Sequence, residues 1–259
     1  GQNFSVLQGT LNTAGRTMAF AAGSGLLVEN ATITGGGNII GNLTLGNNAI
    51  VDLSASGTAG GQYTRYVASG NAVLNSSSQL RVNVAGMTSG GAINDFISGS
   101  SRTGTFNSIN LTNNSSPNFT PYELNSATTA GVFFNTAPTG TISNIAVDED
   151  AAPTAVNLDA AFSDLQHTDA QLTYSVVANT NASLFTGSSI SSGVLTLTHA
   201  ANANGFSDIT VRATDPYGQF IETSFRVTVN PVNDAPVLDN NGEMTLSAIT
   251  EDQTNNSGN

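Results

Sequence analysis

Short alternating apolar runs constrain the fold of residues 1–136 more strongly than any other feature of the sequence. Apolar side chains recur at every second position for a few residues, and Gly- and Asn-rich breaks such as GGGN and GNN end each run. Alternate side chains of a strand face opposite sides of a sheet, so each run can bury one face. Gly and Asn tolerate positive φ and suit the tight turns between strands. The runs are LLVENATIT (26–34), NIIGNLTLG (38–46), NAIVDLS (48–54), NAVLNSS (71–77) and QLRVNVAG (79–86).

The close spacing of these runs favours short strands stacked on one another. Expected strand starts fall near residues 26, 31, 39, 43, 49, 66, 72 and 80. Brief strands with polar corners are typical of a parallel β-solenoid, and an irregular β-sandwich is the alternative. This half shows no helical period of apolar residues, so we predict that it is all-β.

Residues 137–236 carry longer alternating runs with wider turns. The expected strands lie within 139–150, 155–162, 170–178, 194–200, 207–215 and 220–230. In the last run Phe225, Val227 and Val229 fall on one face, which we expect to pack while the other face meets water. Six or seven strands in about 100 residues predict a seven-strand Greek-key β-sandwich of immunoglobulin type.

We therefore divide the chain into three parts. Residues 1–136 are expected to form the solenoid, as stalk and cap, and residues 137–236 the sandwich. Residues 237–259 would supply a linker and the first strand of a further, truncated repeat. Charge supports the first boundary, because residues 1–136 carry four acids and four Arg, whereas residues 137–259 carry fourteen acids and two Arg. We expect the chain to be a section of a longer protein.

Charge and composition also limit the partners. The net charge is −12 and all six basic residues are Arg. Nucleic-acid binding needs clustered Lys and Arg, so we expect no nucleic-acid partner. An acidic half favours hard cations instead. The absence of Cys excludes disulfides and thiolate chemistry, and no apolar run is long enough to insert into a membrane.

Side chains that could support catalysis are sparse. His167 and His199 lie in different expected loops without the spacing of a zinc site, so we interpret both as surface residues. The sequence has no GxSxG elbow and no phosphate-binding loop. Asp52 and Asp95 are weak candidates for a carboxylate pair in glycoside hydrolysis. We predict that the chain is not an enzyme.

Acidic and amide side chains gather at the expected strand ends of residues 137–236. They are Glu149, Asp150, Asp164, Asp169, Asp215, Asn233 and Asp234. Calcium takes six to eight oxygen ligands, which one short loop seldom supplies. Several loops would have to converge at one end of the sandwich, and we expect Ca²⁺ as the bound ion.

Three segments of this half carry a resemblance to a known family. They read VDEDAAPTAVNLDAAFSDLQHTDAQLTYSV, LTLTHAANANGFSDITVRATDPYGQF and FRVTVNPVNDAPV, within residues 137–237. In combination and order they resemble the cadherin-like repeat of very large bacterial surface proteins. The resemblance implies sandwiches strung head to tail, with calcium at the junctions. The ligands that it implies are Glu149, Asp150, Asp164, Asp169 and Asp215, with Asn233 and Asp234 serving the next junction.

Segments of the first half resemble another group of surface proteins. The stretch GNIIGNLTLGNNAIVDLS is similar to the passenger stalks of bacterial autotransporters. Residues 103–114 and 132–135 resemble the closing strands that cap such a stalk. This resemblance implies the solenoid already favoured by the strand spacing.

Both junctions depart from the family pattern. Thr136 stands where the cadherin-like family has Asp, and Leu165 and Gln166 occupy positions where it commonly repeats Asp. A hydroxyl is a much weaker calcium ligand than a carboxylate, so we predict a weak calcium site at the first junction, or none. At the second junction residues 244–256 resemble only the opening strand of the following repeat.

The stretch VNPVNDAPV (229–237) places Asn233 and Asp234 between two prolines. Pro231 and Pro236 hold φ near −65° and push their neighbours toward extended conformations. We interpret the pair as an ion site within a stiff linker. An Asx turn capped by Asn233 without a metal is the alternative.

These observations predict a non-enzymatic section of a large extracellular protein of the bacterial cell surface. It would be a structural or adhesive rod stiffened by Ca²⁺ at its junctions. The expected partners are neighbouring repeats of the same or a longer chain, surface glycans or other cells, and further copies in an oligomer or filament. Two alternatives stay open: a carbohydrate-binding or polysaccharide-processing solenoid with an accessory sandwich, and a self-assembling filament or surface-layer subunit.

Overall fold

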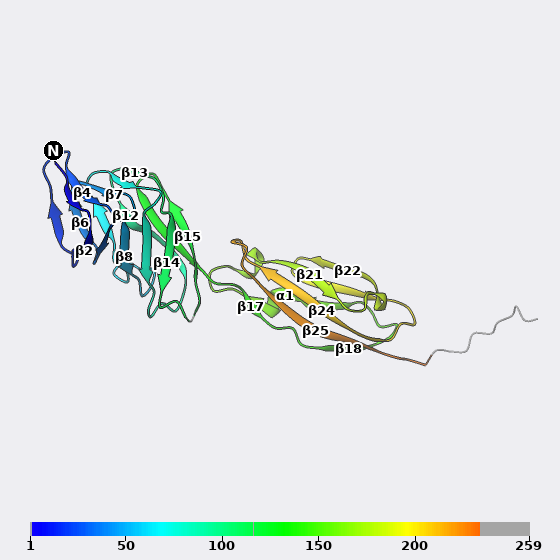
Figure 1. The fold of residues 1–259 in the computed structure, drawn as a ribbon. Helices are drawn as coiled ribbons and strands as arrows, with labels where there is room; N and C mark the ends of the chain where they lie inside the picture. Colours follow the sequence, from blue (N-terminus) through cyan, green and yellow to red (C-terminus); the bar gives the residue numbers. More distant parts are fainter. Residues whose placement is uncertain (1, 116, 234–259) are drawn as a thin grey trace, which may run out of the picture.

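The computed structural model describes residues 2–115 and 117–233. The chain is all-β and contains parallel sheets. Figure 1 shows two β-rich units arranged end to end, which we call the N-terminal unit (residues 2–135) and the C-terminal unit (residues 139–230). Over the described ranges, no helix is long and apolar enough to cross a membrane.

From β1 to β14, each strand of the N-terminal unit pairs in parallel with the strand three positions away in the chain. This pairing builds three sheets. The first contains β1 (Phe4–Val6), β4 (Gly25–Val28), β7 (Asn42–Leu45), β10 (Ala72–Leu74) and β13 (Arg102–Thr103). The second contains β2 (Gly9–Asn12), β5 (Ala31–Thr34), β8 (Ile50–Ser54), β11 (Gln79–Asn83) and β14 (Ser108–Thr112). The third contains β3 (Thr17–Ala19), β6 (Gly37–Ile40), β9 (Tyr66–Ala68), β12 (Gly91–Ser98), β16 (Thr129–Asn135) and β15 (Thr120–Asn125). β16 runs antiparallel to both β12 and β15, so this hairpin closes the third sheet.

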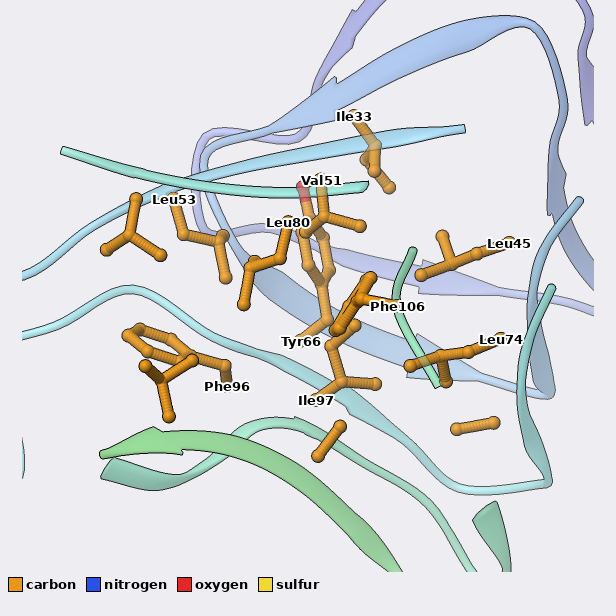
Figure 2. Packing of buried hydrophobic residues seen from close by; sticks show 14 of the residues in the cluster. Ile33, Leu45, Val51, Leu53, Tyr66, Leu74, Leu80, Phe96, Ile97 and Phe106 are labelled. Carbon is orange, nitrogen blue, oxygen red and sulfur yellow. The ribbon is translucent and has the colours of Figure 1, made fainter. Parts of the chain in front are cut away.

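Apolar side chains stack in register inside the N-terminal unit. Ile33 pairs with Val51, and Val51 pairs with Leu80 on the next strand. All three are fully buried. Figure 2 shows them packed with side chains of the other two sheets, among them Leu45 and Tyr66. Full burial of one such aliphatic side chain contributes about 1.5–3 kcal/mol, and each strand obtains this burial only through its neighbours.

Asn side chains connect successive strands at the corners. Asn30 and Asn48 both adopt positive φ, at 49° and 51°, and Asn48 Nδ2 donates to Asn30 Oδ1 over 3.0 Å. At another corner the Asn71 backbone N–H donates to Asn42 Oδ1 over 2.8 Å. Asn tolerates the left-handed conformation of a tight turn, and its amide can also bond the next corner. The Asn-rich breaks of the sequence therefore hold the stacked turns together.

The hydroxyl of Tyr66 is a polar group inside the core of the N-terminal unit. It donates to the Thr34 carbonyl over 2.8 Å and lies 2.9 Å from Thr13 Oγ1. The residue is fully buried. Burial raises the pKa of Tyr66 to about 12, because the phenolate would lose its hydration.

The C-terminal unit contains two main sheets and one short strand pair. One sheet has the order β18 (Ile145–Asp148), β25 (Phe220–Asn230), β24 (Gly205–Thr214) and β21 (Thr173–Asn179). The other has the order β19 (Thr154–Asn157), β23 (Val194–His199) and β22 (Phe185–Ser191). The short pair is β17 (Thr139–Gly140) with β20 (Phe162–Ser163). Inward side chains of both sheets, such as Leu195, Val211 and Val227, form a core separate from that of the N-terminal unit.

Most strands expected from the alternation are present. Phe225, Val227 and Val229 are buried along β25 while their neighbours are more exposed, which confirms the expected inward face. The alternation does not predict β22, whose sequence FTGSSIS is mostly polar, because that strand has little apolar surface to bury. It also misses β1, β2 and β3, whose side chains are largely exposed.

The expectation of one strand through residues 155–162 is wrong. The strand ends at Asn157, and Leu158–Ala161 form the helical turn α1. The Asn157 side chain accepts the Ala160 backbone N–H over 3.1 Å and so caps this turn. Leu158 is fully buried and belongs to the core. Apolar residues spaced as in this segment are compatible with a strand and with a short helical turn. The capping residue Asn157 determines that the chain forms a helical turn here.

We expect the stability of the N-terminal unit to fall between pH 10 and pH 12 because of Tyr66. In the unfolded chain Tyr ionises near pH 10, whereas in the folded chain the pKa of Tyr66 is about 12. The contribution is fully present below pH 10 and is lost as pH rises through 12, by about 3 kcal/mol. Chemical denaturation at a series of pH values measures it. In the Tyr66→Phe variant this component of the pH dependence should be absent, and parallel curves for the two proteins would contradict the assignment.

Candidate metal centre

Aromatic rings order the junction between the two units. Phe133 of β16 stacks on Tyr217, which lies in the hairpin between β24 and β25, with ring centroids 4.5 Å apart and ring planes inclined by 13°. Tyr122 of β15 packs against the same ring at 4.6 Å, and its hydroxyl donates to the Tyr217 carbonyl over 3.2 Å. The closing hairpin of the N-terminal unit therefore docks directly on a turn of the C-terminal unit.

A buried polar cluster lies next to these rings. One potential ligand atom from each of Asp164, His167 and Asp215 lies within 4.8 Å of the other two. The side chain of Asp164 is 0% exposed and that of His167 is 6% exposed, and Asp215 is 4% exposed. We call these three residues, together with Asn135, the junction centre.

Local turns fix the orientation of both carboxylates. Asp164 follows β20, and its Oδ1 accepts the backbone N–H groups of Gln166 and His167 over 2.8 and 2.9 Å. Asp215 follows β24, and its Oδ1 accepts the N–H groups of Tyr217 and Gln219 over 2.8 and 2.9 Å. Short Asp side chains commonly cap turns in this way, and here the second oxygen of each carboxylate stays available to the centre.

Contacts across the junction complete the centre. Asn135, at the end of β16, is fully buried, and its Nδ2 donates to Asp215 Oδ2 over 2.6 Å. His167 Nδ1 lies 2.9 Å from Asp164 Oδ1. Of the six buried side-chain atoms without a hydrogen-bond partner in the described part of the chain, three lie at this junction, namely Asp164 Oδ2, Asn135 Oδ1 and Gln166 Nε2. Buried polar atoms normally have partners, so these three need an explanation.

Two of the three residues that depart from the pattern expected from the sequence, Thr136 and Gln166, pair with each other. Both the backbone N–H and the hydroxyl of Thr136 donate to Gln166 Oε1, each over 2.9 Å. Both side chains are neutral, so this pair adds no charged ion ligand to the junction. The pairing forms a direct link between the residue that follows β16 and the C-terminal unit.

The other predicted ligands lie elsewhere. Asp169 is exposed and begins the 3₁₀ turn Asp169–Gln171, outside the junction centre. The pKa of Tyr174 is raised, mainly by burial and then by the Asp159 side chain, with the negative charge of Asp169 as the smallest cause.

Glu149 and Asp150 lie at the opposite end of the C-terminal unit, which we call the C-terminal pole. The Glu149 backbone N–H donates to the Asn230 carbonyl at the end of β25, whereas Asp215 precedes the start of that strand. The eleven residues of β25 span about 35 Å at 3.2–3.4 Å per residue. Among the predicted ligands that the structure describes, Asp164 and Asp215 come together in one cluster, and Glu149 and Asp150 lie at the opposite end of the unit.

Glu149 ties the outgoing linker to the C-terminal unit. It is 6% exposed, its Oε1 accepts the Val232 N–H over 2.6 Å, and its Oε2 accepts Asn204 Nδ2 over 3.3 Å. Asp150 is exposed at φ 63°. Asn233 is the last described residue, and the predicted ligand Asp234 lies outside the described residues, as do residues 244–256.

The two ends differ in the ions that they fit. The C-terminal pole offers carboxylate and amide oxygens, and oxygen is the ligand that Ca²⁺ prefers. The junction centre adds an imidazole nitrogen, which suits Zn²⁺ and related transition ions rather than Ca²⁺. The interpretation of His167 as a surface residue is wrong. The spacing of Asp164 and His167 within one turn, DLQH, is the sequence signal that could have identified it.

The remaining candidates have structural contacts. Asp52 pairs with Arg81 over 3.3 Å. Asp95 pairs with Arg65 and accepts the Tyr63 hydroxyl over 2.6 Å, and this hydrogen bond raises the pKa of Tyr63. His199 is half-buried, not on the open surface, and its Nε2 lies 2.8 Å from Thr154 Oγ1.

Comparisons with known proteins assign no role to either end. No protein-family model and no curated protein matches the chain. What the two ends do must therefore be argued from their residues and contacts.

We expect Phe133 and Tyr217 to be energetically coupled across the junction. A double-mutant cycle with Phe133→Ala and Tyr217→Ala should give a coupling of about 0.5–1.5 kcal/mol, the usual value for an aromatic pair. The measurement is the unfolding free energy of the C-terminal unit. Phe206→Ala is the matched control, because Phe206 is exposed and packs under Arg226 on the same unit. Its coupling to Phe133→Ala should be zero, and equal coupling in both cycles would contradict a specific contact.

Proposed function

We propose that this chain is a non-enzymatic section of a large extracellular protein of the bacterial cell surface, where it serves as a structural or adhesive rod. In this proposal the N-terminal unit is a parallel β-solenoid and the C-terminal unit is a Greek-key sandwich of the cadherin-like type. Neighbouring repeats of the same or a longer chain are the main partners. The all-β architecture and the end-to-end units of Figure 1 support it.

The main support for this proposal is the parallel pairing of two strands near the two ends of the C-terminal unit in the chain. β18 lies near the beginning of this unit and β25 at its end, and the two strands pair in parallel from Ile145–Val227 to Asp148–Asn230. Tension between the two chain ends pulls parallel neighbours in opposite directions along their length. It must break the ladder bonds together, in shear, rather than one after another.

Side-chain contacts extend this ladder at both ends. Asn144 Oδ1 accepts the Arg226 N–H over 2.8 Å just before β18. The Glu149 N–H donates to the Asn230 carbonyl over 2.8 Å just after it. Glu149 also holds the linker through Val232. The part of the unit that would carry load is therefore longer than the strand itself.

Calcium at the C-terminal pole is the second part of the proposal. Glu149 carries a buried carboxylate whose recorded partners, Val232 N–H and Asn204 Nδ2, are neutral. Each carboxylate oxygen keeps acceptor capacity beyond one hydrogen bond. Asp150 follows Glu149 in the chain, Asn233 follows Val232, and Asp234 is proposed as a further ligand. A bound cation would balance the buried charge and restrict the linker.

We expect force applied to the two ends of the chain to reveal the β18–β25 ladder. By the two-residue repeat of a parallel ladder, the N–H of Val147 faces β25, as that of Glu149 does, and the N–H of Ala146 faces away. Val147→Pro removes a ladder donor and should lower the unfolding force of the C-terminal unit, whereas Ala146→Pro should leave it nearly unchanged. Single-molecule pulling measures this, and unfolding of residues 145–230 should release about 300 Å of chain. Equal forces for both variants would count against a load-bearing ladder.

We expect Ca²⁺ to stabilise the C-terminal unit through Glu149. At a hundredfold excess over Kd, one site contributes about 2.7 kcal/mol, and a chelator should remove it. Glu149→Gln should abolish most of the rise in melting temperature seen by calorimetry. Glu222→Gln is the control, because Glu222 is an exposed residue of β25 that pairs with Arg212. A melting curve that neither Ca²⁺ nor EDTA moves would reject calcium at this pole.

A further inference from the structure

We propose that the junction centre, formed by Asn135, Asp164, His167 and Asp215, binds one divalent transition-metal ion such as Zn²⁺ rather than Ca²⁺. The proposal deepens the rod function and rests on it only for its mechanical consequence, since the ion would join β16 to the β24–β25 hairpin. Three of these residues come from the C-terminal unit and one from the N-terminal unit.

The ligand atoms are already close to the spacing that such an ion needs. One ligand atom each from Asp164, His167 and Asp215 lies within 4.8 Å of the others, and His167 Nδ1 is 2.9 Å from Asp164 Oδ1. Ligands of a tetrahedral ion with bonds near 2.0–2.2 Å are about 3.4 Å apart. Small side-chain rotations would close the centre around the ion without moving the strands.

Buried negative charge independently points to a cation. Asp164 and Asp215 are both buried, and the recorded Arg ion pairs of the described residues, made by Arg65, Arg81, Arg212 and Arg226, all lie elsewhere. His167 is the one titratable group recorded against Asp164 as a possible positive partner. Buried charges in proteins are paired or coordinate metals. A divalent ion would balance both carboxylates at once.

Unpartnered atoms supply the second line of evidence. Asp164 Oδ2 is buried on a side chain that is 0% exposed, and it has no hydrogen-bond partner within the described ranges. Asn135 Oδ1 is also buried without a hydrogen-bond partner, and Asn135 Nδ2 donates to Asp215 Oδ2. Leaving a buried acceptor without a partner is costly. Both atoms belong to the centre, and coordination would satisfy both.

The oxygen supply argues against calcium here. Oδ1 of Asp164 already accepts two backbone N–H groups, as does Oδ1 of Asp215. Thr136 and Gln166 are bonded to each other. The oxygens that keep acceptor capacity are then Asp164 Oδ2 and Asn135 Oδ1, which have no partner, and Asp215 Oδ2, which accepts only Asn135 Nδ2. These three are fewer than the six to eight ligands of Ca²⁺. Three oxygens and one imidazole match the mixed four-coordinate sites of zinc instead.

The aromatic rings of the junction hold the imidazole in place. The centroid of the His167 ring lies 5.9 Å from that of Phe133 and 5.7 Å from that of Tyr217. Packing of this kind fixes ring orientation and limits water access, which strengthens metal binding. Phe133 belongs to the N-terminal unit, so the docked joint itself completes the surroundings of the centre.

The test uses Co²⁺ as a spectroscopic substitute for zinc on the intact, metal-stripped chain. We expect one Co²⁺ per chain with a visible absorption band that excess Ca²⁺ does not displace. His167→Gln should weaken this binding at least about tenfold, since even outer-shell changes cost 10–100-fold. His199→Gln is the matched control and should bind as the parent does. Circular dichroism confirms that each variant is folded.

A second variant keeps the test decisive if His167→Gln perturbs the joint. Asp215→Asn retains the shape and the turn hydrogen bonds to the side-chain oxygen but removes the charge, and it should also lose the Co²⁺ band. Binding of Co²⁺ that survives both changes, or that Ca²⁺ displaces at equal concentration, would overturn the proposal. So would a parent chain that shows no band. The calcium effect at Glu149 and the pulling force of Val147→Pro do not depend on this centre, so failure of the rod function is recognised separately.

Discussion

In-register pairing of very short strands is the constraint on which the rest of the structure depends. A strand of three to five residues cannot bury enough apolar surface alone, so each one needs a parallel neighbour. The stack must end somewhere, and it ends in the antiparallel hairpin of β15 and β16. Alternation along β16 buries Val132 and Phe134 in the core and leaves Phe133 half-buried on the other face. The ring that docks the C-terminal unit is therefore a direct consequence of how the stack is closed.

The joint combines apolar and polar contacts that depend on each other. The stacking of Phe133 on Tyr217 brings the end of β16 against the β24–β25 hairpin and so places Asn135 beside Asp215. Exclusion of water then makes the electrostatic demands of the buried carboxylates larger. The hydrogen bonds between Thr136 and Gln166 meet part of the polar demand without charge. A cation at the junction centre would meet the remainder, which is why we place it there.

The sequence predicts the strands better than it predicts the centre. Strands with clean alternation and a buried face, such as β25, follow from period-two burial alone, whereas β22 is held by its neighbour β23 and leaves little trace in its own sequence. Asp164 and Asp215 could be selected because each ends a strand and caps a turn. The sequence does not show at which end of the C-terminal unit each of the other acids lies. Their position depends on the end of the long strand at which each loop lies, and this is set by the fold. Asn135 and His167 were not identified as site residues, since their roles arise from contacts between units that lie far apart in the chain.

The two ends of the C-terminal unit meet different mechanical and chemical demands. At the C-terminal pole, Glu149 holds the linker that follows β25, and the oxygen ligands proposed there would adjust as the linker bends. At the junction, the covalent connection between β16 and β17 is only three residues long, Thr136 to Pro138. An ion that bridges Asn135 and Asp215 would act beside this short connection and resist bending, while the backbone carries the tension. A small ion with few, fixed ligands suits such a rigid joint better than the larger and more variable coordination of calcium.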